Sequence, residues 1–126
     1  MAHILIVDDS PTERHFLKSV LTENGYDISL AENAEQGIEM AMSEHPDLIL
    51  MDVVMPGMNG FQATWFLTKS PKTADIPVLM VSTKSDQTDQ VWASRQGAKA
   101  YITKPVDGKA LKMITMHLNV VASLSH

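Results

Sequence analysis

Short runs of apolar residues alternate along this chain with longer segments in which apolar residues recur every three or four positions. The short runs have the length of β-strands and end at Gly, Pro, Asn, Asp or Ser, which favour turns. The spacing in the longer segments is typical of amphipathic helices. The pattern predicts strands at residues 3–7, 26–31, 48–52, 77–82 and 100–105.

The third of these strands, residues 48–52, is the most informative. Four consecutive apolar residues without alternation predict a strand that is buried on both faces, as in the middle of a parallel sheet. The run stops at Asp52, and the turn residues of segment 56–60 prevent its continuation. Ligands of open α/β sheets bind at the carboxyl ends of the strands, so Asp52 is predicted to lie where chemistry is done.

Each predicted strand is followed by a predicted helix. Ser10 can cap the first helix, Pro11 suits its first turn and Glu13 completes a capping box. The other helices are predicted from Asn33 to before Pro46, from about Asn59 to Ser70, around Val91 and Trp92 as far as Gly97, and from about Asp107 through Leu111, Ile114, Leu118 and Val121. A polar segment, residues 83–89, precedes the fourth helix, and residues 123–126 are predicted to fray.

Five alternations of strand and helix with short connections demand a parallel sheet with right-handed crossovers and helices on both faces. We therefore predict an α/β fold: a five-stranded, doubly wound sheet of the flavodoxin-like kind, with strand order 2-1-3-4-5. A length of 126 residues suits one domain, which we place at residues 1–122.

Composition excludes several classes of protein. The apolar stretches are too short for a membrane span or a signal peptide, and without cysteine there is neither a disulfide nor a thiolate metal site. We expect a cytoplasmic protein. The net charge of −5 argues against direct binding of nucleic acid. The five His residues are scattered, as expected for surface residues rather than metal ligands.

Chemically useful side chains end four of the five strands. Asp8 and Asp9 follow the first strand, Asp52 the third, Ser82 the fourth and Lys104 the fifth. Three carboxylates close together take up protons unless a cation joins them, and Mg²⁺ is the natural choice for oxygen ligands. Such a site could stabilise a phosphoryl group transferred to a carboxylate nucleophile, Asp52. Each residue alone is most often a turn former or a surface residue, but their joint placement indicates function.

The motifs stand in order as residues 7–10 (Val-Asp-Asp-Ser), 52–60, 82–83 (Ser-Thr) and 104–105 (Lys-Pro). With them, the whole chain resembles the receiver domains of bacterial two-component response regulators. It is most similar to stand-alone, chemotaxis-type regulators, and among these to regulators of twitching motility. The closer likeness rests on residues 61–64, Phe-Gln-Ala-Thr, and on Val91-Trp92 before Gln96-Gly97-Ala98.

The resemblance implies that Asp52 accepts a phosphoryl group from a histidine kinase. Mg²⁺ would be held by Asp9, Asp52 and the backbone carbonyl of Val54, with Asp8 acting mainly through water. Lys104 would pair with the phosphoryl oxygens, and the Lys104–Pro105 peptide bond would be cis. Ser82 would move inward to the phosphoryl group, and Tyr101 would swing between an exposed and a buried rotamer.

The resemblance also implies a signalling protein rather than an enzyme. We expect a monomer that contacts a protein target or drains phosphoryl groups from a shared kinase, because no output domain follows residue 126. The surface that partners read would comprise the 90–97 helix, the fifth strand and the last helix. Trp92, Met113 and Met116 are candidate anchors there, although packing against the sheet is the commoner role for such methionines.

Three positions depart from the family pattern. Ser82 stands where Thr is commoner, Val54 where chemotaxis relatives often carry a polar residue, and Lys84 where they often carry an acid. We predict that Val54 slows loss of the phosphoryl group by shielding it from water.

Two other readings stay open. A hydrolase of the haloacid-dehalogenase type also has a nucleophilic Asp at a strand end, but usually has a second acid where this chain has Val54, and a cap insertion. A binding module that keeps the fold without being phosphorylated is the other alternative. Nucleotide binding is weaker, because residues 57–60 match neither the P-loop nor the dinucleotide fingerprint.

Overall fold

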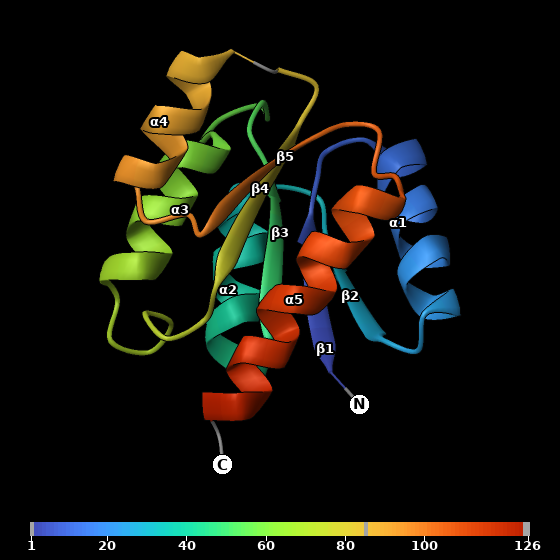
Figure 1. Cartoon of the computed structure of the whole chain (residues 1–126). Helices are drawn as coiled ribbons and strands as arrows, with labels where there is room; N and C mark the ends of the chain where they lie inside the picture. The colour runs from blue at the N-terminus through green and yellow to red at the C-terminus, as the bar shows by residue number, and fades with distance from the viewer. Residues whose placement is uncertain (1, 85, 125–126) are drawn as a thin grey trace.

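A computed structural model describes the backbone of residues 2–84 and 86–124, and the side chains of this range as far as residue 118 (Figure 1). Strands and helices alternate along the chain, as the sequence predicts. They are β1 (His3–Val7), α1 (Pro11–Glu23), β2 (Asp27–Ala31), α2 (Ala34–Glu44), β3 (Leu48–Asp52), α3 (Gly60–Lys69), β4 (Val78–Ser82), α4 (Gln87–Arg95), β5 (Ala100–Thr103) and α5 (Gly108–Leu124).

The five strands form one parallel sheet in the order β2-β1-β3-β4-β5, which confirms the predicted topology. All five residues of the central strand β3 are buried. The adjacent strand β4 is buried throughout as well, whereas β2 and β5 at the edges are only partly covered. The uninterrupted apolar run of β3 therefore reflects contact with helices on both faces.

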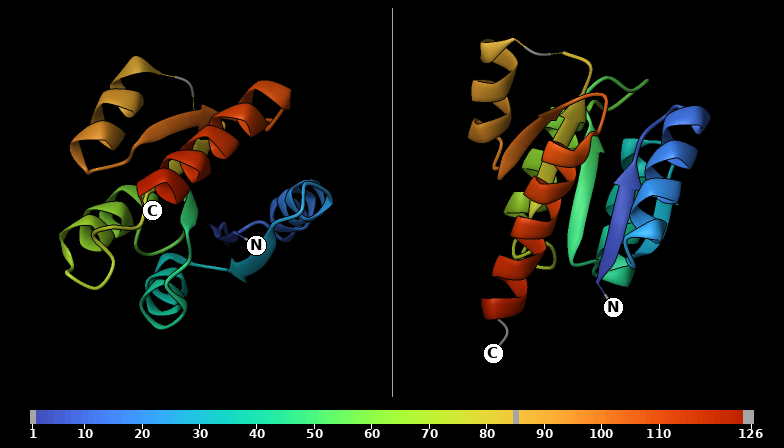
Figure 2. Two further views of the ribbon diagram at one scale, coloured as in Figure 1. Left: turned by 60° about the horizontal axis from the view of Figure 1, so that its bottom comes forward. Right: turned by 45° about the vertical axis from the view of Figure 1, so that its right-hand side comes forward.

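The core is divided by the sheet into two layers. On one face α2, α3 and α4 pack against side chains such as Leu5 and Val7, and on the other α1 and α5 pack against Ile4 and Ile6. Alternation along β1 between the two layers follows from the two-residue repeat of a strand. Figure 2 shows α1 and α5 on one side of the sheet and the other three helices opposite them.

The capping box predicted for α1 is only half formed. The Ser10 side chain accepts a hydrogen bond from the Glu13 backbone N–H at 3.3 Å. The Ser10 N–H, however, donates to Asp8 at 2.9 Å, and the Glu13 carboxylate lies toward Lys104. A complete box occurs at α3 instead, between Asn59 and its third following residue. Proximity to the acidic strand ends thus redirects the box at α1.

The strands β2 and β4 each begin one residue later than predicted, and larger differences occur in the last three elements. Helix α4 begins at Gln87, inside the segment predicted to be a polar loop, and β5 ends at Thr103, before Pro105, which has no N–H to donate to a sheet. Helix α5 continues to Leu124, past the expected end at residue 122; residues 125 and 126 and the side chain of Val121 lie outside the described part. Among the described residues, every helix is too short or too polar to cross a bilayer.

Candidate functional site

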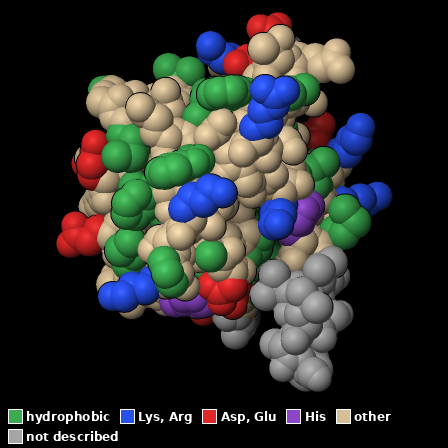
Figure 3. Space-filling model, turned by 90° about the vertical axis from the view of Figure 1, so that its left-hand side faces the viewer, with side chains coloured by type: hydrophobic (Ala, Val, Ile, Leu, Met, Phe, Trp, Pro, Cys, Tyr) green, Lys and Arg blue, Asp and Glu red, His purple; other side chains and the backbone are tan. Residues whose placement is uncertain are grey.

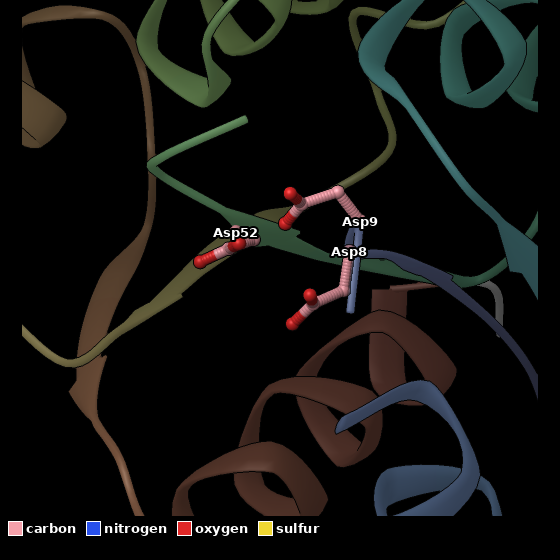
Figure 4. A group of neighbouring side chains, drawn as sticks. All are labelled: Asp8, Asp9 and Asp52. Carbon is pink, nitrogen blue, oxygen red and sulfur yellow. The ribbon is translucent and has the colours of Figure 1, made fainter. Parts of the chain in front are cut away.

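The three acids meet at one edge of the sheet, as predicted. Asp52 ends β3, and Asp8 and Asp9 follow the neighbouring strand β1, where Val7 is in register with Met51. One carboxylate oxygen from each acid lies within 4.8 Å of the others (Figure 4). Asp8 and Asp52 are buried, whereas Asp9 is exposed at the mouth of the site.

The ammonium group of Lys104 lies beside the buried acids of the site. Its Nζ donates a hydrogen bond to Asp8 Oδ2 at 2.9 Å and lies 3.6 Å from Asp52 Oδ1 and 3.8 Å from Glu13 Oε2. The backbone N–H of Lys104 donates to the Ser82 carbonyl at 2.7 Å, so the end of β4 fixes its position. The Lys104–Pro105 peptide bond is cis, which confirms that prediction.

Burial and neighbouring groups shift the pKa values of both Asp52 and Lys104. Burial raises the pKa of Asp52 to about 6, and the neighbouring Asp8 adds to the rise, while Lys104 and the Val53 N–H, 3.0 Å from Asp52 Oδ1, oppose it. Burial lowers the pKa of Lys104, but its hydrogen bond to Asp8 and the charges around it outweigh this and raise the pKa above its usual value. Of the two buried acids, Asp52 is the one farther from the Lys104 ammonium.

The donor set fits a hard divalent cation. Three carboxylates converge, and their mutual repulsion contributes to the raised pKa of Asp52, which a bound cation would relieve. Oxygen ligands with open positions for water are typical of Mg²⁺ sites. The side chains of Asp9 and Asp52 could hold such an ion directly. Asp8 accepts hydrogen bonds from Lys104 and from the Ser10 N–H, and its water-mediated role at the ion stays a prediction.

Helix α3 begins next to the carboxyl end of β3. The N–H of Gly60 donates to the Val53 carbonyl at 2.9 Å. A Cβ added at Gly60 would lie 1.9 Å from the carbonyl oxygen of Asp52, so only glycine fits here. The Gly60 position thus ties the start of α3 to the backbone of Asp52.

The predicted switch residues lie around the neighbouring strand ends. Ser82 is buried and accepts a hydrogen bond from the Lys84 N–H at 3.2 Å. Tyr101 is half-buried, and its hydroxyl donates to the Lys84 carbonyl at 2.9 Å, so it contacts the loop that leads from β4 to α4. Val54 is 57% exposed beside the site.

The sequence did not point to Arg14. Its Nη1 donates to the Asp8 carbonyl at 2.7 Å, its side chain is 13% exposed and its Nη2 lies 3.8 Å from Glu32 Oε1. Arg14 thus steadies the backbone of the first acid. The available signal was that Arg14 and Lys18 are the two basic residues among the first 60, and that Arg14 lies one turn into the helix that follows the acids.

The three candidate anchors for a partner, Trp92, Met113 and Met116, differ in exposure and in the surface on which they lie. Met113 is half-buried against the core under α5, which favours the packing role, whereas Met116 is 57% exposed. Trp92 is 48% exposed and lines a groove together with residues of α3, so it belongs to a different surface from Met116 on α5.

A parallel sheet of this order with acids, a lysine and a buried hydroxyl at its carboxyl edge is the arrangement of a phosphoryl-accepting regulator. The response regulator receiver domain family matches residues 4–115, and the chain belongs to this family. It is 55% identical over 111 residues to protein PilH of Pseudomonas aeruginosa, covering 88% of this chain and 92% of PilH.

Solved structures agree with this assignment. The chemotaxis protein CheY4 of Vibrio cholerae superimposes with a TM-score of 0.86 at 26% identity, covering 94% of this chain and 98% of CheY4. The response regulator TrrA of Thermotoga maritima, solved in complex with Mg²⁺ and BeF, gives a TM-score of 0.82 at 32% identity, covering 94% and 99%. The predicted fold and the predicted resemblance are both confirmed.

Proposed function

We propose that this receiver domain accepts a phosphoryl group on Asp52 from a histidine kinase and passes the signal on by protein contact. The observation that carries the proposal is the position of the Lys104 ammonium, which lies 2.9 Å from Asp8 and 3.6 Å from Asp52. One cation is shared between two buried acids, and the acid farther from it is the one at the strand end. The pKa of that acid is raised to about 6, so it is still ionised at neutral pH and can act as the nucleophile.

The chemistry follows from these positions. A carboxylate oxygen of Asp52 attacks the phosphorus atom, the bond from phosphorus to the kinase imidazole breaks, and the imidazole keeps the electron pair. Lys104 offsets the negative charge that arrives with the phosphoryl oxygens. A Mg²⁺ ion held by Asp9, Asp52 and the Val54 carbonyl would add further positive charge at the same place. The product is an aspartyl phosphate.

The response to phosphorylation would start at the two nearest strand ends. We expect the buried Ser82 hydroxyl to turn toward the new oxygens, which gives up its hydrogen bond from the Lys84 N–H. Tyr101 is bonded to the carbonyl of that same residue, so movement of this loop would change the Tyr101 rotamer. Such a two-state loop converts a local change of charge into a change of surface.

The likeness to PilH supports a place in a chemosensory system that controls twitching motility by type IV pili, in the cytoplasm. The partners would be a histidine kinase and a protein target. Draining of phosphoryl groups from a shared kinase is the other mode of output compatible with this site.

The test is incubation with Mg²⁺ and a small phosphodonor such as acetyl phosphate, followed by intact-mass measurement of the wild type and of Asp52→Ala. A persistent adduct of one phosphoryl group in the wild type, absent from the variant, is expected. Rapid release of inorganic phosphate without a trapped adduct would instead indicate a hydrolase. No adduct and no release would indicate a passive binding module.

A further inference from the structure

Helices α3 and α4 enclose an open groove of about 650 Å³ on the face that Figure 3 presents. Hydrophobic side chains gather on this face, with Lys and Arg side chains among them and Asp and Glu side chains toward its edges. The groove is lined by Met58, Asn59, Phe61, Gln62, Trp65, Phe66, Trp92 and Gln96. Its volume lies within the range of about 300–1,000 Å³ that is usual for ligand sites.

Large apolar side chains in this groove are left in contact with water. Trp65 is 51% exposed, Trp92 48% and Phe66 40%. The chain has two tryptophans in all, and both line the groove. Exposed aromatic side chains grouped in one hollow are typical of protein interaction sites, since aromatic residues are enriched at interface cores.

The groove has a fixed base. The Thr68 hydroxyl of α3 donates to the Gln96 carbonyl at the end of α4 at 2.9 Å. Gly97, with a φ of +102°, packs so closely on Thr68 that an added Cβ would lie 2.7 Å from its methyl group. The two helices are thus joined at their carboxyl ends, and the aromatic side chains form a preformed hollow beside this joint.

The charges around the groove differ from those of the molecule as a whole. The protein carries a net charge of −5, yet α3 contains no acid and ends in Lys69, and α4 contains Asp89 in its first turn and Arg95 in its last. Lys69 follows Trp65 by four positions and Arg95 follows Trp92 by three, so each cation shares a helix face with a groove tryptophan, near the carboxyl end of its helix. Asp89 precedes Trp92 by three positions and shares its face at the other end of α4. Both cations are exposed.

From this complementarity we propose that the groove between α3 and α4 docks an acidic amphipathic helix of a partner protein. Its apolar face would cover the tryptophans, and its Asp or Glu side chains would meet Lys69 and Arg95. A helix is the fitting occupant because the walls of the groove are themselves helices, and helix-in-groove recognition uses apolar anchors at helical spacing. The proposal can be tested without phosphorylation, because none of the side chains that line the groove belongs to the acidic site.

The two tryptophans provide the measurement. Two synthetic 18-residue helical peptides would share one face of Leu and Phe and carry either Glu or Lys at all polar positions. We expect the Glu peptide to shift the tryptophan emission of the full chain and to bind at least about tenfold more tightly than the Lys peptide. Overall net charge predicts the opposite preference, so this result is specific to the groove.

Variants locate the binding. Reversal of both rim charges, Lys69→Glu with Arg95→Glu, should invert the preference between the peptides, whereas Lys109→Glu with Lys112→Glu on α5 should leave it unchanged. Trp92→Ala should weaken binding of the Glu peptide at least about tenfold, with Trp65 as reporter. Met116→Ala, at an apolar side chain of α5 that is at least as exposed, should not weaken it. Asp52→Ala should bind as the wild type does, which separates this test from that of the phosphorylation.

Three results would overturn the proposal. The first is that neither peptide perturbs the tryptophans. The second is equal binding of both peptides, which would mean unspecific apolar contact. The third is a dimer in sedimentation that Trp92→Ala dissolves, which would make a second copy of the chain the occupant.

Discussion

Asp52 is the residue at which burial and charge are in conflict. It shares Lys104 with Asp8, but the ammonium lies closer to Asp8, at 2.9 Å against 3.6 Å. Asp8 is also fixed by the Ser10 N–H, whereas the backbone donor to Asp52 is the N–H of the next residue, Val53. Lys104 and the Ser10 N–H thus form their closest contacts with Asp8 rather than with Asp52. The Asp52 carboxylate is therefore left able to bind a cation and to accept a phosphoryl group.

This conflict predicts how stability depends on pH. A folded-state pKa of about 6, raised from 3.8, means that the contribution of Asp52 to stability is full below pH 3.8 and is lost as the pH rises through 6. Without Mg²⁺, Asp52→Asn should raise the free energy of unfolding by about 2 kcal/mol at pH 8 and leave it nearly unchanged at pH 4.

Urea unfolding at the two pH values measures this effect. Asp27→Asn, at an exposed position on β2, serves as the matched control and should show no such gain. An Asp52→Asn protein whose stability follows pH as the wild type does would refute the assigned conflict.

Val54 carries a second prediction at this scale. Its apolar side chain is 57% exposed beside the site. Val54→Asn should speed the loss of the phosphoryl group several-fold, because an amide can orient an attacking water where valine only shields, while Val54→Leu should keep the slow rate. Decay of phosphorylated protein after removal of the donor gives both rates. Equal rates for the Asn variant and the wild type would count against shielding.

The site residues could be found from the sequence because their position depends on topology alone. Asp8, Asp9, Asp52, Ser82 and Lys104 all follow strand ends, and a parallel sheet brings such ends together. Arg14 could not be found, because its contact with the Asp8 carbonyl depends on how α1 leans on β1. The sequence also could not show that the Lys104 ammonium lies closer to Asp8 than to Asp52, because the two distances differ by less than 1 Å.

At the scale of elements, the start of α3 packs directly against the backbone of Asp52. Gly60→Ala would bring a methyl group to 1.9 Å from the Asp52 carbonyl oxygen, so the helix or the strand must shift. We expect a loss of at least about 2 kcal/mol in stability together with slower phosphorylation.

The matched control for Gly60 is Gly108→Ala. Gly108 begins α5, and an added Cβ there meets nothing within 4 Å. This change should stabilise the protein by about 0.4–1 kcal/mol and leave phosphorylation intact. Chemical denaturation and the intact-mass assay compare the two variants. A Gly60→Ala protein with wild-type stability would show that the contact is unimportant.

Element boundaries were predictable where chemistry marks them. β1 and β3 match the prediction to the residue, because an Asp ends or follows each apolar run. The predicted start of α4 was wrong because the first turn of this helix, residues 87–90, has no apolar residue. The preceding residue, Asp86, also forms no side-chain hydrogen bond that caps the helix. Helix α4 is stabilised by packing against the sheet, chiefly β5, and the local sequence at its start does not mark where it begins.

At the scale of the whole molecule, charge is distributed unevenly. Eleven of the fifteen acids lie in the first 60 residues, and eight of the ten basic residues lie after them. Lys104 comes from the basic half and meets acids of the other half at the edge of the sheet. The site therefore forms only when the two halves of the chain are packed together.

Mg²⁺ binding should consequently stabilise the entire fold. At a concentration about ten times its dissociation constant, the ion should add about 1.4 kcal/mol and raise the melting temperature by several degrees. The rise should be larger at pH 7.5 than at pH 5, because protonation of Asp52 competes with the ion. Asp9→Ala should lose most of the rise, whereas Glu39→Ala, on the exposed face of α2, should keep it. Equal rises at both pH values would contradict this linkage.

The most direct test of the account is to identify the carboxylate that takes the phosphoryl group. After reaction with Mg²⁺ and acetyl phosphate, borohydride reduces an aspartyl phosphate to homoserine, and peptide mass mapping locates that residue. We predict homoserine at position 52 and unchanged aspartate at positions 8 and 9. Homoserine at position 8 or 9, or at none of the three, would contradict the assignment of Asp52 as the acceptor.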